Sequence, residues 1–364
     1  MAAPPPSLLL VDDDEGQLYA LAENLKGRLA DIGADVRSWV PRRDEDAMAR
    51  LAGLVDGSTA LVVTDWDLST KGLTGFFGPT IVGWCQQRAI PVGDFSRKTA
   101  EALPTEPNFF ELRVPTDDTA AAFVEQAFRG FLAIKQGIAD QPELYIPLRS
   151  PAAVLALLLG RPDLEAQLGL YSPHLGSASG SLLQRILKTA PSDVVPDDAE
   201  KLSLLAYVAG HVLLNAVLKY PGPILSGEAL CAYFAAAPDA FAQLAEAFED
   251  ARYTGPFSGN GNFFWRDVID DILEQWSEGL AEDDDTVGAF NRMVVERQLA
   301  VALPRHGCTR CAGANGGFYC PFTRRPVCVR SDCSVSSSSW LPDGARVCRV
   351  EHEFYEEWAP LLGL

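Results

Sequence analysis

The chain has 364 residues, of which 48% are hydrophobic and 22% are charged, a composition typical of folded globular domains and not of a disordered chain. At this length two or three domains are expected. The formal net charge of −19 excludes broad, non-specific attraction to nucleic acid or to anionic membranes, because the field of the protein repels phosphate.

The first residues do not have the pattern of a targeting segment. No basic residue precedes the short apolar run at 8–11, and three aspartates follow it. No uninterrupted apolar stretch approaches the length of a membrane span. The sequence therefore predicts a cytoplasmic protein without a membrane partner, in which the eight cysteines are thiols or metal ligands and not disulfides.

Short apolar runs alternate with amphipathic segments as far as residue 139. The runs predict strands at 7–11, 36–40, 60–64, 91–95 and 109–114. The amphipathic segments predict helices at 18–32, 44–55, around 81–85 and at 123–134. This alternation indicates an α/β fold with a doubly wound, five-stranded parallel sheet over residues 1–140. In such a sheet the functional crevice lies at the carboxyl ends of the strands.

The rest of the chain changes character twice. Two prolines in 141–150 break the periodicity and predict a linker. Residues 151–301 are predicted to form a mainly α-helical domain, and residues 302–364 a small cysteine-rich module of the zinc-binding type. The predicted helices are 179–189, 197–220, 226–236, 238–251, 264–280 and 287–301. His211 lies on the apolar helix 197–220, which predicts a hydrogen-bonded core histidine.

Aspartates follow three of the predicted strands. Asp12, Asp13 and Asp14 follow the first strand, Asp65 ends the third, and Gly93-Asp94-Phe95-Ser96 ends the fourth. Carboxylates at the ends of adjacent parallel strands converge at one edge of the sheet, where their oxygens are able to hold a hard divalent cation. Such a cation neutralises charge on a transferring phosphoryl group, so that a carboxylate can attack it. The alternative is a solvated turn at 12–14 and an ordinary strand-end carboxylate at 65.

The order and spacing of these strand ends resembles the receiver domain of two-component response regulators, and in particular the chemotaxis-type single-domain receivers. The resemblance covers residues 6–139. It implies that Asp12 and Asp13 bind Mg²⁺ and that Asp65 is both a ligand and the phospho-acceptor, served by an upstream histidine kinase or another phosphodonor. The backbone carbonyl of Asp67 would be a further ligand.

Two positions matched to the family carry the response to phosphorylation. Ser96 matches the hydroxyl that bonds the phosphoryl group, and Phe110 matches the aromatic switch on the fifth strand. Arg113 stands where the family has a lysine followed at once by proline, and arginine is bulkier and forked. The loop 69–72 also differs, because the family usually has a proline and a shorter turn there. These departures keep a pseudo-receiver open as the alternative.

Six of the eight cysteines lie near the C-terminus, with two histidines among them. The candidate metal ligands are His306, Cys308, Cys311, Cys320, Cys328, Cys333, Cys348 and His352. The spacing of Cys308 and Cys311 is that of a zinc knuckle. The set predicts structural Zn²⁺, and its size fits either one ion or two. Buried or oxidised thiols and an iron–sulfur cluster are the alternatives, although the spacings do not match common ferredoxin runs.

Three functions are compatible with these features. The preferred prediction is a signalling protein in which phosphorylation of Asp65 regulates the helical and zinc-type modules, which act through protein–protein contact. The second is an adaptor or scaffold that works without phosphorylation within a larger complex. The third is nucleic-acid sensing by the arginine-rich residues 302–364. No motif for an enzymatic output is found, beyond self-phosphorylation from a phosphodonor, and the sequence leaves a homodimer open.

Overall fold

The computed structural model describes residues 4–42, 45–68, 77–95, 109–171, 197–280, 286–313, 316–336 and 340–360. They pack into two compact units. The first holds the described residues within Met1–Glu101, Asn108–Ser150 and Ser177–His211, and the second holds those within Pro151–Gly176 and Val212–Leu364. Residues far beyond the N-terminal 140 therefore complete the first unit.

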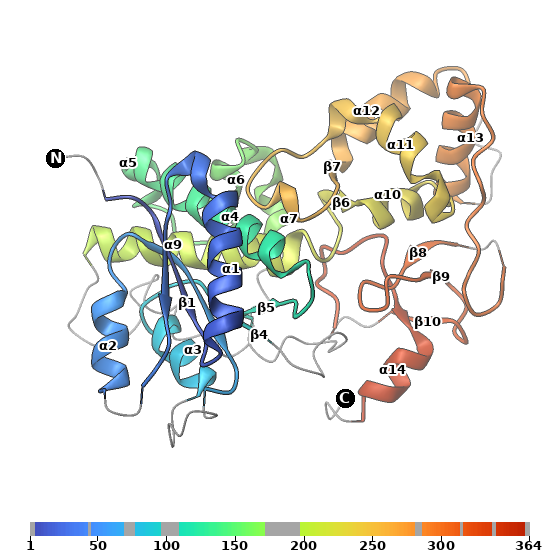
Figure 1. The fold of residues 1–364 in the computed structure, drawn as a ribbon. Helices are drawn as coiled ribbons and strands as arrows, with labels where there is room; N and C mark the ends of the chain where they lie inside the picture. Colours follow the sequence, from blue (N-terminus) through green and yellow to red (C-terminus); the bar gives the residue numbers. More distant parts are fainter. Residues whose placement is uncertain are drawn as a thin grey trace. The chain divides into compact units, whose positions relative to one another are not determined.

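A five-stranded parallel sheet forms the centre of the first unit (Figure 1). Its strands are β1 (Ser7–Val11), β2 (Asp35–Trp39), β3 (Thr59–Asp65), β4 (Val92–Phe95) and β5 (Leu112–Val114). They lie in the order β2-β1-β3-β4-β5, and every neighbouring pair is parallel. This confirms the predicted doubly wound sheet. The chain order reverses between β1 and β3, and this switch point is where such sheets place their ligands.

Helices cover both faces of the sheet because β1 and β3 are buried on both sides. The helices are α1 (Glu15–Arg28), α2 (Ala47–Leu54), α3 (Gly78–Gln86) and α4 (Ala120–Asp140). On one face Leu9, Val62 and Val92 share a core with α2 and α3. The alternate residues Leu8 and Leu10 point to the other face, where α1 and α4 pack together on the sheet.

The aromatic residue expected on the fifth strand lies before it. The strand was predicted to begin at Phe109, but β5 begins at Leu112, and Phe110 occupies the preceding turn. Its ring is buried because it stacks on Tyr207 of α9 (Asp198–Val212), with 5.3 Å between centroids and 16° between planes. The Tyr207 hydroxyl also donates to the Phe110 carbonyl at 3.3 Å. Phe110 is thus buried by packing against a helix distant in sequence and not by pairing within the sheet.

Helix α9 approaches α4 closely at Gly210. A Cβ on Gly210 would lie 2.5 Å from a ring carbon of Phe131 on α4, so only glycine fits there. The neighbouring His211 is completely buried, with its ring 5.0 Å from that of Phe131 and 4.7 Å from that of Tyr207. The predicted core position of His211 is confirmed, and its surroundings are aromatic. A short helix, α5 (Pro142–Tyr145), occupies the segment predicted as a linker.

Before its C-terminal module, the described part of the second unit contains helices and one small antiparallel ladder of β6 and β7. Its elements up to residue 299 are α6 (Pro151–Leu158), α7 (Glu165–Gly169), β6 (Ile224–Ser226), α10 (Gly227–Tyr233), α11 (Phe241–Ala247), β7 (Phe263–Trp265), α12 (Arg266–Trp276) and α13 (Val287–Leu299). The predicted helix 264–280 is wrong at its start. Phe264 and Trp265 instead pair with β6, since consecutive aromatic residues favour a strand. The predicted helix 179–189 lies outside the described residues.

Short strands and one helix form the C-terminal module. They are β8 (Gly316–Tyr319), β9 (Pro326–Cys328), β10 (Ser334–Val335), β11 (Val350–Glu351) and α14 (His352–Trp358). Phe322 stacks on Phe354 at 5.3 Å, and the fully buried Trp340 packs edge-on against both rings. These aromatic residues build a small core. Within the described parts of the chain, no helix has both the length and the apolar character needed to cross a membrane.

Replacement of Gly78 by alanine is expected to destabilise the first unit. A Cβ at Gly78 would lie 2.3 Å from the Asp65 carbonyl oxygen, which is backbone and cannot rotate away. We expect Gly78→Ala to lower the free energy of unfolding by about 2 kcal/mol in urea denaturation. Gly83→Ala on the same helix is the control, because nothing lies within 4 Å of its added Cβ. Equal stability of the two variants would contradict the packing described.

The stability of the protein is expected to depend on His211 below neutral pH. Burial lowers the pKa of His211 to about 3, below its ordinary value of 6.5, so the folded chain keeps the ring neutral. The unfolded chain binds the proton first, and stability is lost as pH falls below 6.5. Between pH 7 and pH 5 this loss is about 2 kcal/mol. Urea denaturation of His211→Leu should show a correspondingly smaller loss than the natural protein. If stability falls equally with pH in the two proteins, His211 is not the group responsible for the loss.

Candidate metal centres

The first candidate centre begins where β1 runs into α1. Asp12 and Asp13 directly follow β1 and are 6% and 5% exposed. Asp14 is the N-cap of α1, and its carboxylate accepts hydrogen bonds from the backbone N–H groups of Gly16 and Gln17. The Asp14 N–H donates to Oδ1 of Asp12 at 2.8 Å. The helix cap therefore holds the turn in which the two buried carboxylates lie.

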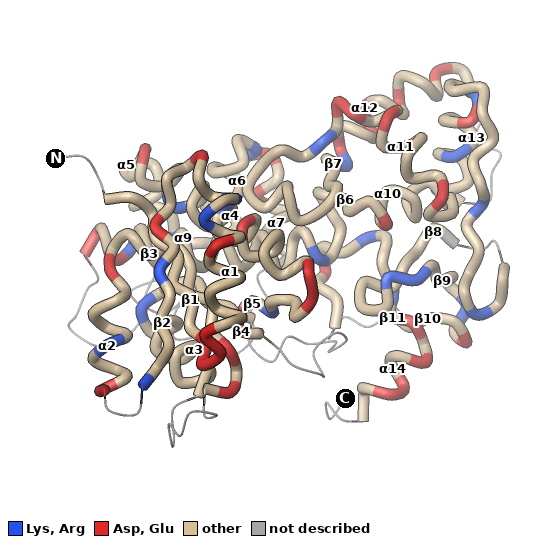
Figure 2. The backbone as a smooth tube through the Cα atoms, in the orientation of Figure 1, with Lys and Arg blue, Asp and Glu red and all other residues tan. Residues whose placement is uncertain are grey.

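The second element of this centre is the end of β3. Asp65 is the last residue of that strand and is 2% exposed. Asp12, Asp13 and Asp65 each offer a carboxylate oxygen, and these oxygens lie within 4.8 Å of one another. Acidic residues gather along the edge of the sheet beside α3 (Figure 2). The three aspartates could together bind a cation, at the switch point between β1 and β3.

Repulsion inside this cluster is large. Two carboxylates 4.8 Å apart repel by about 3 kcal/mol at an effective dielectric constant of ~20. Burial raises the pKa of Asp12 to about 6, and the charges of Asp65, Asp13 and Asp14 raise it too, although the hydrogen bond from Asp14 opposes them. The cluster must therefore either take up protons or hold a cation. Oxygen donors alone are the ligand set of hard divalent ions.

A fourth buried carboxylate lies beside the cluster. Asp94 on β4 is 5% exposed, and its strand neighbours in register are Thr64 on β3 and Arg113 on β5. Burial raises the pKa of Asp94 to about 6, the charge of Arg113 lowers it, and the charge of Asp65 raises it. Asp94 thus faces a positive charge on one side and the cluster on the other. The sequence places Asp94 at the end of the fourth predicted strand but gives it no role of its own. The signal in the sequence that could have identified Asp94 was its position within a predicted buried strand.

The other residues matched to the receiver family lie outside the three-aspartate cluster or outside the described residues. Asp67 is exposed, beyond the end of β3, and Arg113 is half-buried on β5. Ser96 and the loop 69–72 lie outside the described residues. Two large apolar side chains near the cluster are exposed, Trp66 at 53% and Phe77 at 44%. The described site therefore consists of the three clustered aspartates with Asp94 and Arg113 beside them.

The second candidate centre is a cluster of four cysteines. Cys308, Cys311, Cys328 and Cys333 place their Sγ atoms within 4.8 Å of one another, and those of Cys311 and Cys328 are 3.7 Å apart. All are buried except Cys311, which is half-buried. Four sulfur donors at one point could hold a metal ion in tetrahedral geometry. The knuckle pair Cys308 and Cys311 is thus completed by a second pair, of which Cys328 ends β9 and Cys333 follows it.

Hydrogen bonds hold both pairs, from backbone N–H groups at Cys308 and Cys311 and from the Ser334 hydroxyl at Cys328. Burial raises the pKa of the Cys308 thiol, but N–H groups of Cys311 and Arg310 hydrogen-bond to it and bring its pKa down to about 7. The N–H of Gly313 donates to the Sγ of Cys311 at 3.4 Å. The hydroxyl of Ser334 donates to the Cys328 carbonyl at 2.6 Å. Donors directed at sulfur stabilise thiolates, which are the metal-binding form.

The four other candidate ligands of this region are not part of the cluster. Cys320 and Cys348 are buried elsewhere in the module, as free thiols. His306 places Nε2 3.0 Å from the Val327 carbonyl, and His352 lies with Nδ1 3.4 Å from Glu356. Among the described residues, the structure therefore assembles one four-cysteine centre. Cys348 and His352, whose spacing fits a ligand pair, belong to no group of three or more potential metal ligands among the described residues.

Comparisons with protein-family models, with curated proteins and with solved structures find no match for this chain. Its functional assignment therefore depends on the geometry of the two centres.

Loss of one cluster cysteine is expected to release a bound metal ion. Cys328→Ser removes a thiolate from the centre of the four-cysteine set, and we expect metal content, measured by plasma mass spectrometry, to fall from about one ion per chain to near zero. Cys320→Ser is the control, because Cys320 is equally buried but lies outside the cluster. A purified natural protein without metal, or equal metal content in the two variants, would refute the centre.

Proposed function

We propose that this protein is a receiver-type signal-transduction protein, in which Mg²⁺-dependent phosphorylation of Asp65 regulates a helical and zinc-stabilised output through protein–protein contact. The observation that carries the proposal is the convergence of Asp12, Asp13 and Asp65 at the switch point of a parallel sheet in the order β2-β1-β3-β4-β5. A buried set of carboxylates at that point fits a cation, and such a cation can in turn bind an anionic phosphoryl group.

Asp12, Asp13 and Asp65 would hold the Mg²⁺ ion, since all three offer hard oxygen ligands. When bound, the ion offsets the negative charge that accumulates on the oxygens of a transferring phosphoryl group. Asp65 is best placed as the nucleophile because it ends the central strand β3, with Asp12 and Asp13 directly after the neighbouring strand β1. The Thr64 hydroxyl donates to the Asp65 carbonyl at 3.0 Å and helps to hold this strand end.

The chemical step is a transfer to an oxygen of Asp65. One carboxylate oxygen attacks the phosphorus of a phosphodonor, and a new P–O bond forms as the bond to the leaving group breaks. The leaving group departs with the electron pair and takes a proton from solvent. Burial of Asp65 excludes water from the attack, and the close contact at Gly78 holds its main chain.

The contact between Phe110 and α9 supports a route for the signal within the first unit. Phe110 precedes β5, the strand that carries Arg113, and it packs on Tyr207 and His211. Any displacement of Phe110 must also disturb these rings, because protein interiors are close-packed. Along the chain, helix α9 ends at Val212, where the second unit begins, and a π-helix follows from Leu213 to Val217. A change at the sheet edge would thereby reach α9.

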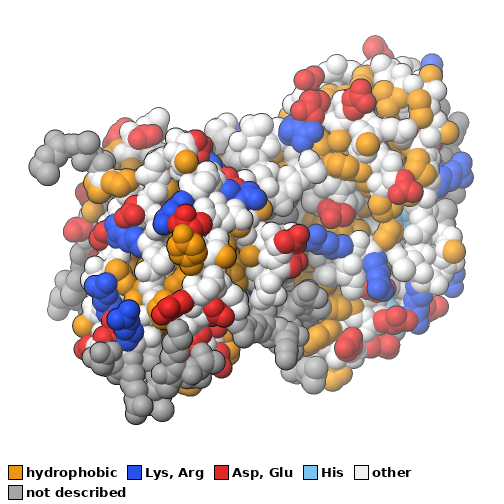
Figure 3. All heavy atoms as spheres, viewed as in Figure 1, with side chains coloured by type: hydrophobic (Ala, Val, Ile, Leu, Met, Phe, Trp, Pro, Cys, Tyr) orange, Lys and Arg blue, Asp and Glu red, His pale blue; other side chains and the backbone are white. Residues whose placement is uncertain are grey.

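The cysteine cluster would hold one structural Zn²⁺ ion. Four thiolates fill a tetrahedral set and leave no position for a substrate, so the role is to stabilise the module. On the face shown in Figure 3, Lys and Arg side chains are interspersed with Asp and Glu. In the module, Arg310 pairs with Glu353 and Arg325 with Glu351. This mixture favours a protein partner over a nucleic acid.

An adaptor that works without phosphorylation is the second candidate. The observation that favours it is Asp94, because its charge is opposed to that of Arg113 in the next strand. An arginine engaged with a buried carboxylate is less available to a phosphoryl group than a free cation would be. In this function the first unit would be a docking platform, and its acidic cluster would hold a cation for structural reasons.

Intact-mass analysis with Mg²⁺ and acetyl phosphate tests the proposal. The natural protein is expected to gain one phosphoryl group, whereas Asp65→Asn gains none because its amide is not a nucleophile. Asp67→Asn is the matched control and should be labelled. Asp67 is exposed and would contribute only its backbone carbonyl to the metal ion, which the substitution keeps. Labelling that persists in Asp65→Asn would refute this acceptor. No labelling of the natural protein would favour the adaptor.

A further inference from the structure

The arginines of the C-terminal module differ in what they contact. Three of them pair with carboxylates, namely Arg310 with Glu353 at 2.8 Å, Arg325 with Glu351 at 3.6 Å and Arg330 with Asp332 at 3.8 Å. Arg349 is half-buried, and it forms no ion pair with a carboxylate in the described parts of the chain. A charge that is partly removed from water is costly without a counter-charge. The surroundings of Arg349 must therefore supply negative charge in another form.

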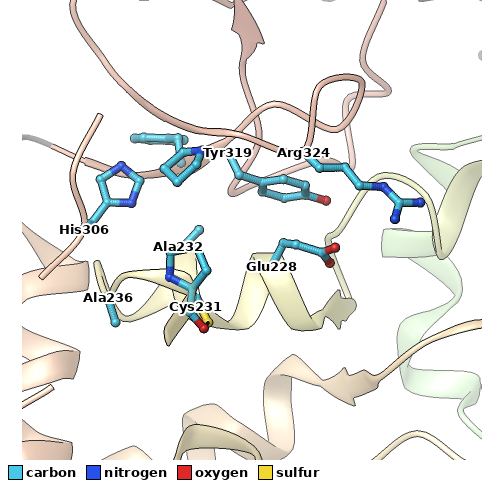
Figure 4. Close-up of a pocket in the computed structure, with 10 residues that line it drawn as sticks. Glu228, Cys231, Ala232, Ala236, His306, Tyr319 and Arg324 are labelled. Atoms are coloured by element: carbon cyan, nitrogen blue, oxygen red, sulfur yellow. Dashed lines mark hydrogen bonds between the residues drawn. The ribbon is translucent and has the colours of Figure 1, made fainter. Parts of the chain in front are cut away.

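Contacts of the backbone and of the side chain hold Arg349 in place. Its backbone N–H donates to the Tyr319 carbonyl at 3.0 Å, and Tyr319 is buried with its ring against α10 (Figure 4). Its Nε donates to Oγ of Ser334 at 2.7 Å, and its Nη2 lies 3.4 Å from the Ser334 carbonyl oxygen. The guanidinium carbon lies 5.8 Å from the centre of the Phe318 ring. The guanidinium is therefore fixed between groups of β8 and β10.

Ser334 connects Arg349 to the four-cysteine cluster. It follows Cys333 directly in the chain, is 1% exposed, and donates its hydroxyl hydrogen to the Cys328 carbonyl at 2.6 Å. Its Oγ thus accepts from Arg349 on one side and donates to the backbone of a cluster residue on the other. Burial lowers the pKa of Arg349 and the charge of Cys328 raises it, so the guanidinium lies within the field of that thiolate.

The charge of the four-cysteine centre explains why a cation belongs beside it. Four thiolates around one divalent ion leave an excess of two negative charges. Solvent offsets little of this excess, because every cluster cysteine except the half-buried Cys311 is buried. N–H groups directed at Cys308 and Cys311 supply partial positive charge, whereas a guanidinium supplies a full one. Outer groups of this kind orient the ligands of a metal site and tune its affinity.

We infer that Arg349 is a positioning residue of the four-cysteine metal centre, held by Ser334 so that its positive charge offsets the excess negative charge of the thiolates and stabilises the bound ion. The inference rests on the structural Zn²⁺ ion proposed above. It separates Arg349 from the other arginines near the cluster, whose charges are offset by carboxylates. The contribution of Arg349 to the centre is then its charge, and a lysine is able to supply the same charge.

Competition for Zn²⁺ between the full-length protein and a chromophoric chelator tests the inference. Arg349→Gln keeps a hydrogen-bond donor but removes the charge, and we expect it to weaken Zn²⁺ binding about 10- to 100-fold. Arg349→Lys keeps the charge, and one ammonium hydrogen can replace the short bond to Ser334, so its affinity should stay within about threefold of the natural value. Arg346→Gln is the matched control and should leave the affinity unchanged, because Arg346 is an exposed arginine of the same segment.

The absorption spectrum of the Co²⁺-loaded protein separates an effect of charge from a change of shape. A positive charge beside the thiolates holds their electrons more strongly. Its loss in Arg349→Gln should therefore move the sulfur-to-cobalt charge-transfer band to longer wavelength. The ligand-field bands, which report the tetrahedral geometry, should keep their positions, and Arg346→Gln should change neither set of bands. Because Co²⁺ is added in excess, the spectrum remains readable if Arg349→Gln also lowers the stability of the module.

The two measurements together decide the role of Arg349. The inference is overturned if Arg349→Gln binds Zn²⁺ within about threefold of the natural affinity, or if Arg349→Lys loses as much affinity as Arg349→Gln. A charge-transfer band that stays in place in Arg349→Gln overturns it too. A natural protein that binds neither Zn²⁺ nor Co²⁺ would refute the metal centre itself, which sets failure of the proposed zinc site apart from failure of the role of Arg349.

Discussion

Repulsion between buried carboxylates at the edge of the parallel sheet is the constraint on which the first unit depends. Parallel strands bring their carboxyl ends to one edge, so Asp12, Asp13 and Asp65 meet there although 52 positions separate Asp13 from Asp65 in the sequence. The fold holds them together through local devices, the Asp14 cap and the close approach of Gly78 to β3. Such an arrangement lowers stability unless a cation or a proton is bound, and this is a reason to assign it a function.

The two candidate centres differ in the chemistry of their donors. Carboxylate oxygens suit a hard ion that keeps open positions, whereas four thiolates suit a soft ion that is completely enclosed. The first centre can therefore change its state during a reaction, and the second can only hold the module together. The aromatic core around Trp340 fits this view, because a module of this size buries little apolar surface without a metal ion.

Helix α9 gives the first unit a feature that a five-stranded α/β domain does not need. Its residues Tyr207 and His211 enclose Phe110, and Gly210 allows it to touch α4. These contacts bury an aromatic side chain and a histidine in one cluster, so α9 cannot leave without exposing both. The helix is therefore part of the domain that would receive the signal, and it is the natural element to respond to it.

The sequence by itself determined the sheet and most of the acidic centre. Short apolar runs mark strands buried on both faces, and aspartates directly after β1 and β3 must meet wherever such strands are parallel and adjacent. Only the tertiary structure decided which cysteines form the cluster, because spacing does not say which of six thiols point to one place. It also decided the neighbours of Asp94 and Phe110. Both depend on contacts between residues distant in sequence, Arg113 across a ladder and Tyr207 on a later helix, and local periodicity carries no information about such contacts.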